Sequence, residues 1–416
     1  MLVLKKNNIF KRVLIVTILS LSFTSLNAFN LGGISFSFFL LCSTIFIGLI
    51  SVFEFKMPAL KDELVILISF YIILSALLNL STFKATSVIY SFLFLFLFLY
   101  ITHYSKKHLS VDNFIWILKF ILIAFFIILL ISQIAVLFDL HNLEGPKGYF
   151  QSTGQLGIQY NNITGVYRFH SLSTEPSYAA IIVLISFAVL SGLVDEKKKL
   201  VVYGAILLYM LFSFKSAIGF IILVFWIFAQ FKIKRKYFII SGSIVLIGIL
   251  LFFFTNVGGK SVERIREVVF LLFSDSSNFI KNLNLIDSSA YARIGPTFTY
   301  IKEMDLLNYH TYFGFGAASS EPYFSKIIYP EAWNKHMVFR PPFIPGFLYD
   351  YGFIGAFLVF AFIWKHIKKQ NIFFKVVFLL IIINSNFNTQ LFWFAIIFIY
   401  LYNFYKPKTK GLINQE

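Results

Sequence analysis

Charged residues are scarce in this chain. They make up 13% of its 416 residues, about half the roughly 25% found in soluble globular domains. Hydrophobic residues make up 58%, and the mean hydropathy is +0.80. Apolar runs such as FILIAFFIILLISQIAVLF at 120–138 approach the ~20 residues that a helix needs to cross a bilayer. The composition therefore excludes an ordinary soluble domain and predicts an all-α, polytopic integral membrane protein.

Cysteine is almost absent as well. Cys42 stands alone in an apolar run, which excludes an internal disulfide framework and a thiolate metal site. Acidic residues are outnumbered by basic ones, 19 to 36, for a formal net charge of +17. Most of the basic excess lies in short segments between apolar runs, as in membrane proteins with basic cytoplasmic loops. We therefore expect membrane lipids, and no nucleic acid, as partners.

Several catalytic signatures are missing too. The chain has no P-loop, no dinucleotide fingerprint and no DxD in its expected external loops. It also lacks the GxSxG and HExxH motifs. His141 and His310 show no ligand spacing, so we expect no metal and no cofactor. The apolar runs carry almost no ionisable residues in their middles, which argues against an ion-coupled pump.

Apolar segments predict about twelve membrane-spanning helices. We expect them near 13–29, 32–53, 63–80, 87–103, 114–138, 177–194, 200–214, 216–231, 237–255, 343–364, 372–386 and 388–404. The chain then divides into five spans in 1–138, a loop at 139–176, four spans in 177–255, a large loop domain at 256–342, and three spans with a tail in 343–416.

Basic residues predict how these helices are oriented. With the N-terminus in the cytoplasm, 21 Lys and Arg residues fall in cytoplasmic segments, against only Lys84 and Lys215 in the short external loops. Both termini are therefore expected in the cytoplasm. The basic N-terminus ahead of VLIVTILSLSFTSLNA is interpreted as leading into an uncleaved first span rather than a signal peptide.

The two long external loops are where function is expected. Within the larger one, SVERIREVVFLLF at 261–273 has a helical apolar face. A second helix is expected after Asp287-Ser288-Ser289, and its apolar face should contain Tyr291, Ile294, Phe298 and Ile301.

Chemically capable side chains gather at the end of the first long loop. YRFHSLSTEPSYAAI at 167–181 holds Arg168, His170 and Glu175 within eight positions. Loops carry function more often than regular elements do, so we take all three as site candidates. The alternative for Glu175 is purely structural, because an acidic residue before Pro176 suits the start of a helix.

The large loop supplies the remaining candidates: Arg293, His336 and Arg340. A solvent-facing charge is the alternative for Arg293, and contact with lipid headgroups is the alternative for Arg340. Asp350 lies a few residues inside an apolar span, where a charge by default indicates function unless the residue is interfacial.

Arginines, histidines and a carboxylate at the outer membrane edge suit one kind of chemistry. Transfer of a sugar at the outer edge of the membrane needs a donor that is already activated and carried on a lipid, such as a polyprenyl diphosphate. Arginine forks bind a diphosphate bidentately and stabilise its developing charge without a metal. A carboxylate or histidine accepts the proton of an attacking sugar hydroxyl.

The layout resembles the O-antigen polymerase (Wzy-type) and O-antigen ligase superfamily. Arg168-Phe169 followed by Glu175-Pro176-Ser177 at the start of a span is similar to the family's Arg-Phe…Gly…Glu-Pro-Asn stretch, with Ser171 where Gly is common. FSFKSAIGFIILVF at 212–225 resembles the family's Ser-rich entry into the following span. The family's order in the large loop is matched by the following residues: Arg293, Gly314-Phe315-Gly316, His336, and Gly352 with Gly355.

The resemblance implies a metal-independent polymerase of surface polysaccharide in the bacterial inner membrane, with a periplasmic site. It would join oligosaccharide repeat units carried on undecaprenyl diphosphate, with a chain-length regulator protein as an expected partner. Arg168, Arg293 and Arg340 would bind the diphosphate, while Glu175, His170 or His336 would act on the acceptor hydroxyl. The alternatives are an O-antigen ligase, which transfers finished polymer to lipid A core, and a flippase or transporter of the lipid-linked unit.

Overall fold

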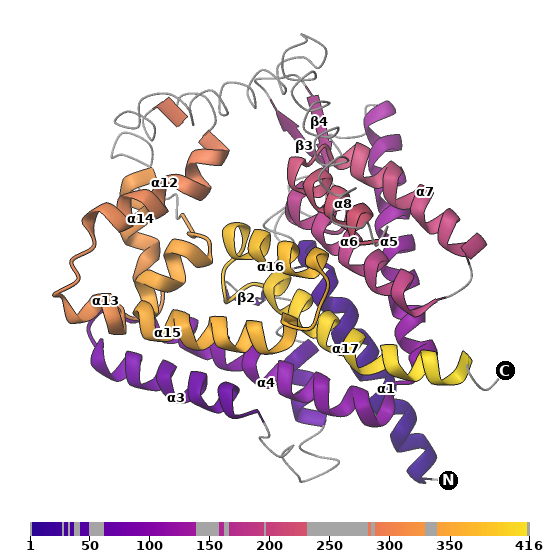
Figure 1. Ribbon diagram of the computed structural model, residues 1–416, viewed down its shortest axis with the longest axis horizontal. Helices are drawn as coiled ribbons and strands as arrows, with labels where there is room; N and C mark the ends of the chain where they lie inside the picture. Colours follow the sequence, from indigo (N-terminus) through magenta and orange to yellow (C-terminus); the bar gives the residue numbers. More distant parts are fainter. Residues whose placement is uncertain are drawn as a thin grey trace, which may run out of the picture.

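The computed structural model describes most of the chain as helix (Figure 1). The described residues are 2–26, 29–31, 34–36, 42–49, 62–138, 158–161, 166–194, 197–230, 282–283, 288–328 and 339–413. The helices are α1 (Leu2–Ser22), α3 (Glu63–Leu78), α4 (Ala85–His108), α5 (Val111–Leu137), α6 (Pro176–Leu193), α7 (Lys197–Phe214), α8 (Ala217–Gln230), α12 (Ser288–Glu303), α13 (Tyr309–Phe313), α14 (Ser320–Ile328), α15 (Phe343–Ile367), α16 (Ile372–Asn384) and α17 (Gln390–Ile413), with the 3-10 turn η1 (Thr24–Leu26). Antiparallel hairpins pair β1 (Phe29–Leu31) with β2 (Ile34–Phe36) and β3 (Ile158–Asn161) with β4 (Val166–Phe169).

Helix starts follow local capping signals. Asp62 accepts the amide of Leu64 at 3.2 Å at the start of α3, and Ser110 accepts that of Asn113 at 3.2 Å at the start of α5. Each cap satisfies an amide that the first turn of a helix leaves without an internal partner. The sequence therefore sets where these apolar helices begin.

The chain is a helical membrane protein. Among the described residues, four helices are long and apolar enough to cross a bilayer: α4, α5, α6 and α15. Shorter apolar helices cover Glu63–Leu78, Ile218–Ile227 and Ile372–Asn384. The segments expected at 237–255 and 261–273 lie outside the described residues.

The N-terminal region differs in detail from expectation. The first helix, α1, ends at Ser22 rather than near residue 29, and the start expected for the second span falls within the β1–β2 hairpin. Phe29 pairs with Phe36 and Leu31 with Ile34. The reason is local: the sequence has two glycines between the strands, and Gly-Gly favours a two-residue hairpin turn.

Helix α6 lies at the centre of the molecule. Buried residues make up 83% of its apolar window, against 39% to 56% in the other three candidate spans. It packs against α5, α7, α8 and α17. Because α6 is surrounded by protein, its first residues have a defined environment, whereas α4 and α5 leave broad apolar faces for lipid.

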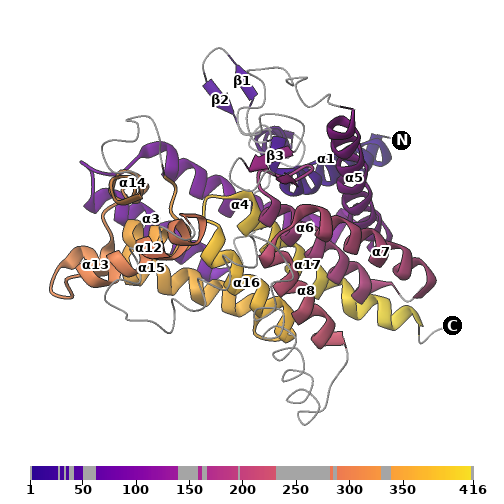
Figure 2. The same ribbon diagram turned by 90° about the horizontal axis from the view of Figure 1, so that it is seen from above.

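The helices form two groups in both views. Helices α12, α13 and α14 gather with α15 on one side, and α5 to α8 gather on the other (Figures 1 and 2). The first group is joined to α15 at a break in that helix, where Gly352 has φ 65° and ψ −174°. A Cβ at Gly352 would lie 2.3 Å from the carbonyl oxygen of Tyr312, so this close approach requires glycine.

Polar contacts identify the opposite ends of the bundle. At one end, Lys365 near the end of α15 contacts Asp62 before α3, at 3.0 Å. At the other end, the backbone amide of Lys84, before α4, donates to the carbonyl of Ala317 at 2.9 Å. Residues 314–321 therefore lie at the end of the bundle where α3 is joined to α4.

Candidate functional site

The stretch after β4 is held in a fixed turn ahead of α6. The Oγ of Thr24, in η1, contacts the Oγ of Ser173 at 2.9 Å and accepts the amide of Thr174 at 3.1 Å. Ser171 has φ +50°, in the left-handed region that favours glycine. Its hydroxyl donates to the carbonyl of Phe125 in α5 at 2.7 Å, which anchors this conformation.

His170 is part of that turn. Its ring is buried, and Nδ1 bonds to the carbonyl oxygen of Ser173. A carbonyl only accepts, so Nδ1 carries the proton and Nε2 is the nitrogen left to take one. Burial lowers the pKa of His170 below its ordinary 6.5, the Ser173 hydrogen bond opposes this, and the charge of Arg168 lowers the pKa further. The ring is therefore neutral at pH 7 and orders the chain that leads to Glu175.

Arg168 is presented by the β3–β4 hairpin. It lies in β4 opposite Gln159, and its side chain is partly buried. Its charge acts on His170, two residues further on. The two neighbouring side chains therefore influence each other electrostatically.

Glu175 occupies the position just before α6, with Pro176 in the first turn. Its carboxylate caps no amide of that helix. It accepts the hydroxyl of Ser177 at 3.1 Å and lies 3.8 Å from Arg293, measured between Oε2 and an Nη atom. Half of the Glu175 side chain is exposed, against about a third of that of Arg293. The purely structural explanation of Glu175 as a helix cap does not account for this contact.

Arg293 comes from α12, the helix expected after Ser288. Thr297, one turn on, donates from its hydroxyl to the carbonyl of Ile344 at 3.3 Å and so ties this face of α12 to the start of α15. Of the residues expected on its apolar face, Tyr291 is buried, whereas Ile294, Phe298 and Ile301 are 36%, 48% and 57% exposed.

The buried face of α12 instead includes Tyr300, whose ring contacts Phe324 of α14 and Tyr349 of α15. Periodicity finds an apolar stripe but does not say where the packing partners lie. Here the packing partners in α14 and α15 determine which face of α12 is buried, and in that orientation Arg293 is directed toward Glu175.

The contact between Glu175 and Arg293 joins residues 118 positions apart, from the two loops that the sequence singles out. His170 lies in the same turn as Glu175, and Arg168 lies in β4 just before that turn. The pair offers a guanidinium group able to bind an anion and a half-exposed carboxylate able to accept a proton.

No family model and no curated protein matches this chain.

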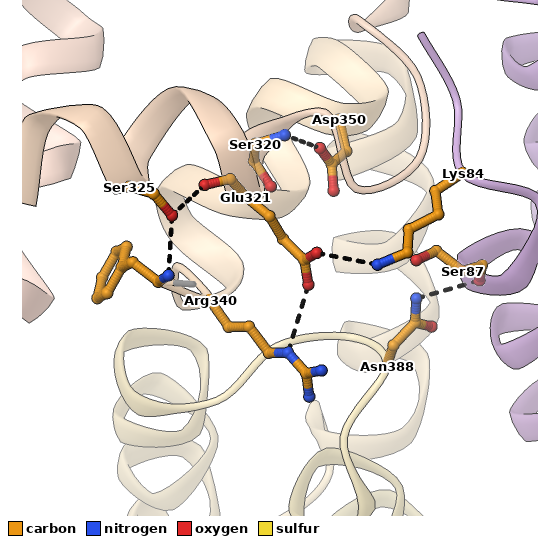
Figure 3. A network of polar contacts seen from close by, with 9 residues as sticks. Lys84, Ser87, Ser320, Glu321, Ser325, Arg340, Asp350 and Asn388 are labelled. Carbon is orange, nitrogen blue, oxygen red and sulfur yellow. Dashed lines mark hydrogen bonds and ion pairs between the residues drawn. The ribbon is translucent and has the colours of Figure 1, made fainter. Parts of the chain in front are cut away.

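Arg340 contacts a different carboxylate. Its Nε lies 3.4 Å from Glu321 of α14, and the Nζ of Lys84 lies 3.4 Å from the other oxygen of the same carboxylate (Figure 3). The structure therefore gives Arg340 a different ion-pair partner from Arg293. His336 lies outside the described residues.

Asp350 organises the segment that carries Glu321. Its Oδ1 accepts the amide of Ser320 at 2.7 Å and the hydroxyl of Ser319 at 3.2 Å. Ser320 is the first residue of α14, so a carboxylate from α15 performs the capping that a side chain of α14 would otherwise supply. Asp350 is thus a positioning residue for Glu321 in this structure.

Lys84 and Glu321 are not among the site candidates that the sequence predicts. Neither has a motif around it, and 237 positions separate them. One signal does exist: Lys84 is one of two basic residues in the short loops expected outside. Within the described ranges, no group of three or more His, Cys, Asp and Glu residues has the geometry to hold a metal ion.

Proposed function

We propose that this protein is a lipid-donor glycosyltransferase that polymerises surface polysaccharide, of the O-antigen polymerase type. It would act at the periplasmic face of the bacterial inner membrane. The observation that carries the proposal is the contact between Glu175 and Arg293 at the start of the central helix. It joins the two segments that resemble that family, and it pairs a candidate base with a candidate diphosphate ligand.

The proposed reaction transfers a glycan from one carrier lipid to the next repeat unit. An acceptor hydroxyl attacks the anomeric carbon of the growing chain, and the bond from that carbon to the diphosphate oxygen breaks. The products are a new glycosidic bond and free undecaprenyl diphosphate, and the hydroxyl proton passes to a base. Arg168 and Arg293 would neutralise the charge that develops on the leaving diphosphate.

Glu175 is better placed than His170 to take the proton. Its carboxylate is half exposed, whereas the ring of His170 is 4% exposed and bonded to the backbone. A diphosphate that binds Arg293 would compete with Glu175 for the guanidinium and release the carboxylate to the acceptor. Binding of the diphosphate would thereby leave the Glu175 carboxylate available to accept the proton of the acceptor hydroxyl.

The arrangement of the bundle ends supports the expected orientation. Asp62 and Lys365, both expected near the cytoplasm, contact each other, and Lys84 contacts residues of the large loop. Both termini would lie in the cytoplasm, and the Arg293–Glu175 pair would lie on the periplasmic side.

Deletion of the gene separates the proposed function from its alternatives. Loss of a polymerase leaves lipid A core capped with a single repeat unit on a polysaccharide gel. Loss of a ligase leaves bare core while polymer accumulates on the carrier lipid. Loss of a flippase leaves bare core and no periplasmic polymer. Either of the last two patterns would overturn the proposal.

Arg168→Ala tests the site itself. We expect loss of polymer at least about a hundredfold, as when one group that stabilises a transition state is removed, with normal amounts of protein in the membrane. Lys302→Ala is the matched control, because Lys302 is exposed at the end of α12. Unchanged polymer length in Arg168→Ala would rule out the role assigned to this arginine.

A further inference from the structure

Two cations share one carboxylate beside the break in α15. Lys84 and Arg340 each contact Glu321 at 3.4 Å, and their side chains are 58% and 80% exposed, whereas that of Glu321 is 19% exposed. The anion therefore lies inside and the cations lie outside. Because one negative charge faces two positive ones, the group carries a net charge of +1, presented to the surroundings.

Hydrogen bonds to the backbone hold the segments that carry Lys84, Glu321 and Arg340 in place. The amide of Lys84 donates to Ala317, three residues before α14, and Asp350 caps α14 next to Glu321. The hydroxyl of Ser325 donates to the carbonyl of Glu321 at 2.5 Å and accepts the amide of Phe339, the neighbour of Arg340, at 2.8 Å. Figure 3 shows the contacts of Ser320 with Asp350 and of Ser325 with Glu321, beside the two cations on the Glu321 carboxylate. The arrangement is therefore built by the fold rather than by three independent surface side chains.

Donors are left over on both cations. The Glu321 contact uses the Nε of Arg340, and Figure 3 shows the two terminal nitrogens of that guanidinium pointing away from the carboxylate. An ammonium has three N–H donors, of which one serves Glu321. The planar guanidinium fork matches a phosphate group, and a lysine adds a point charge to it.

Both cations stand at the ends of membrane-spanning helices. Lys84 directly precedes α4, and Arg340 lies three residues before α15. Helix ends lie at the depth of lipid headgroups, where basic residues between helices bind lipid phosphates. On α4, Ile89 and Phe96 are exposed, and their spacing of seven residues puts them on one helix face. These two side chains offer an apolar surface to the acyl or isoprenoid chain of a lipid.

We propose that Lys84 and Arg340 form a binding site for the phosphate group of a membrane lipid, with the Glu321 carboxylate bridging the two cations. The site is separate from the ion pair of Arg293 with Glu175, and it does not depend on the proposed transfer reaction. Its occupant is a phosphate monoester or diphosphate carried on a lipid. A free phosphate or diphosphate has the same headgroup chemistry, and the experiment below separates the two sources.

The test measures thermal stabilisation of the full chain, purified in a neutral detergent, by three probes. These are dihexanoyl phosphatidic acid, inorganic diphosphate and, as the zwitterionic reference with no net charge, dihexanoyl phosphatidylcholine. We expect phosphatidic acid to raise the melting temperature and phosphatidylcholine not to. Stabilisation by diphosphate equal to that by phosphatidic acid would support the site with a soluble occupant. Lack of stabilisation by both anionic probes would overturn the site.

Variants assign any stabilisation to these residues. In Lys84→Gln/Arg340→Gln we expect phosphatidic acid to bind at least about tenfold more weakly, since two charge-assisted contacts are lost. Lys302→Gln/Lys326→Gln removes the same charge from exposed positions on α12 and α14 and should bind as the parent does. Lys84→Gln/Glu321→Gln/Arg340→Gln guards against misfolding, because it leaves no carboxylate without a cation. Parent-like affinity in either variant lacking Lys84 and Arg340 would overturn the proposal.

Discussion

At the scale of single residues, the turn ahead of α6 shows how one stretch combines folding and chemistry. His170 and Ser171 act on the backbone: the ring bonds to Ser173, and the serine hydroxyl holds a left-handed residue against α5. The φ of Ser171 is positive, a conformation that glycine adopts more readily than serine, so the hydroxyl contact offsets a local strain. Glu175 is the residue of this turn whose carboxylate faces another segment.

His170 makes folding stability depend on pH. Its pKa is lowered in the folded protein, so the unfolded chain binds the proton more tightly. Its contribution is complete above the ordinary pKa of 6.5 and is lost as the pH falls from there toward the lower folded value. We expect the melting temperature in detergent to fall below pH 6.5, and His170→Gln to flatten that fall. Parallel curves for the two proteins would contradict this assignment.

At the scale of elements, the break in α15 decides where the large-loop helices attach. Gly352 and Gly314 both have positive φ and touch across the break, and the hydroxyl of Tyr71, in α3, donates to the carbonyl of Tyr351 at 2.8 Å. Asp350, two residues earlier, caps α14. One interrupted helix thus positions both α13 and α14, and through α14 it positions Glu321.

Gly352→Ala tests this attachment. The backbone conformation is one that essentially only glycine adopts, and it costs another residue about 3 kcal/mol. In addition, the new Cβ would lie 2.3 Å from Tyr312. We expect a large loss of folded protein, measured by size-exclusion chromatography in detergent. Gly48→Ala is the matched control, since a Cβ there has no atom within 4 Å. Normal yield of Gly352→Ala would show that the break is not required.

At the scale of the whole molecule, the bundle is built around α6, and lipid-facing helices lie outside it. The ion pair of Lys365 with Asp62 and the cluster around Glu321 lie at opposite ends of α3. Lys368 directly follows α15, near Lys365. A membrane between the two ends would therefore put Lys368 and the cluster around Glu321 on different sides.

Cysteine labelling checks that orientation. The single native cysteine makes the chain convenient, because Cys42→Ser leaves a background without thiols. In that background we expect Lys302→Cys to react with an impermeant maleimide from the periplasm. Lys368→Cys should react only after the inner membrane is opened. The reverse pattern would contradict the predicted topology and the periplasmic site.

Much of this architecture could be predicted from the sequence. Apolar length and capping residues depend only on neighbours along the chain, so the bounds of α3, α5, α6 and α16 were predicted to within a few residues. The candidates Arg168, His170 and Glu175 were also visible as a local cluster. Distant segments set the packing partners of α12, which local pattern does not record, whereas the hairpin after α1 follows a local Gly-Gly signal that the hydropathy pattern overrode.

The sequence alone determined that this is a helical membrane protein with chemically capable residues before α6 and in the large loop. Only the tertiary structure decided which charges meet. Arg293 contacts Glu175, while Arg340 contacts Glu321 together with Lys84. The physical reason is that an ion pair depends on the separation of two side chains in space. That separation is set by how α12, α14 and α15 pack, and no pattern along the chain records it.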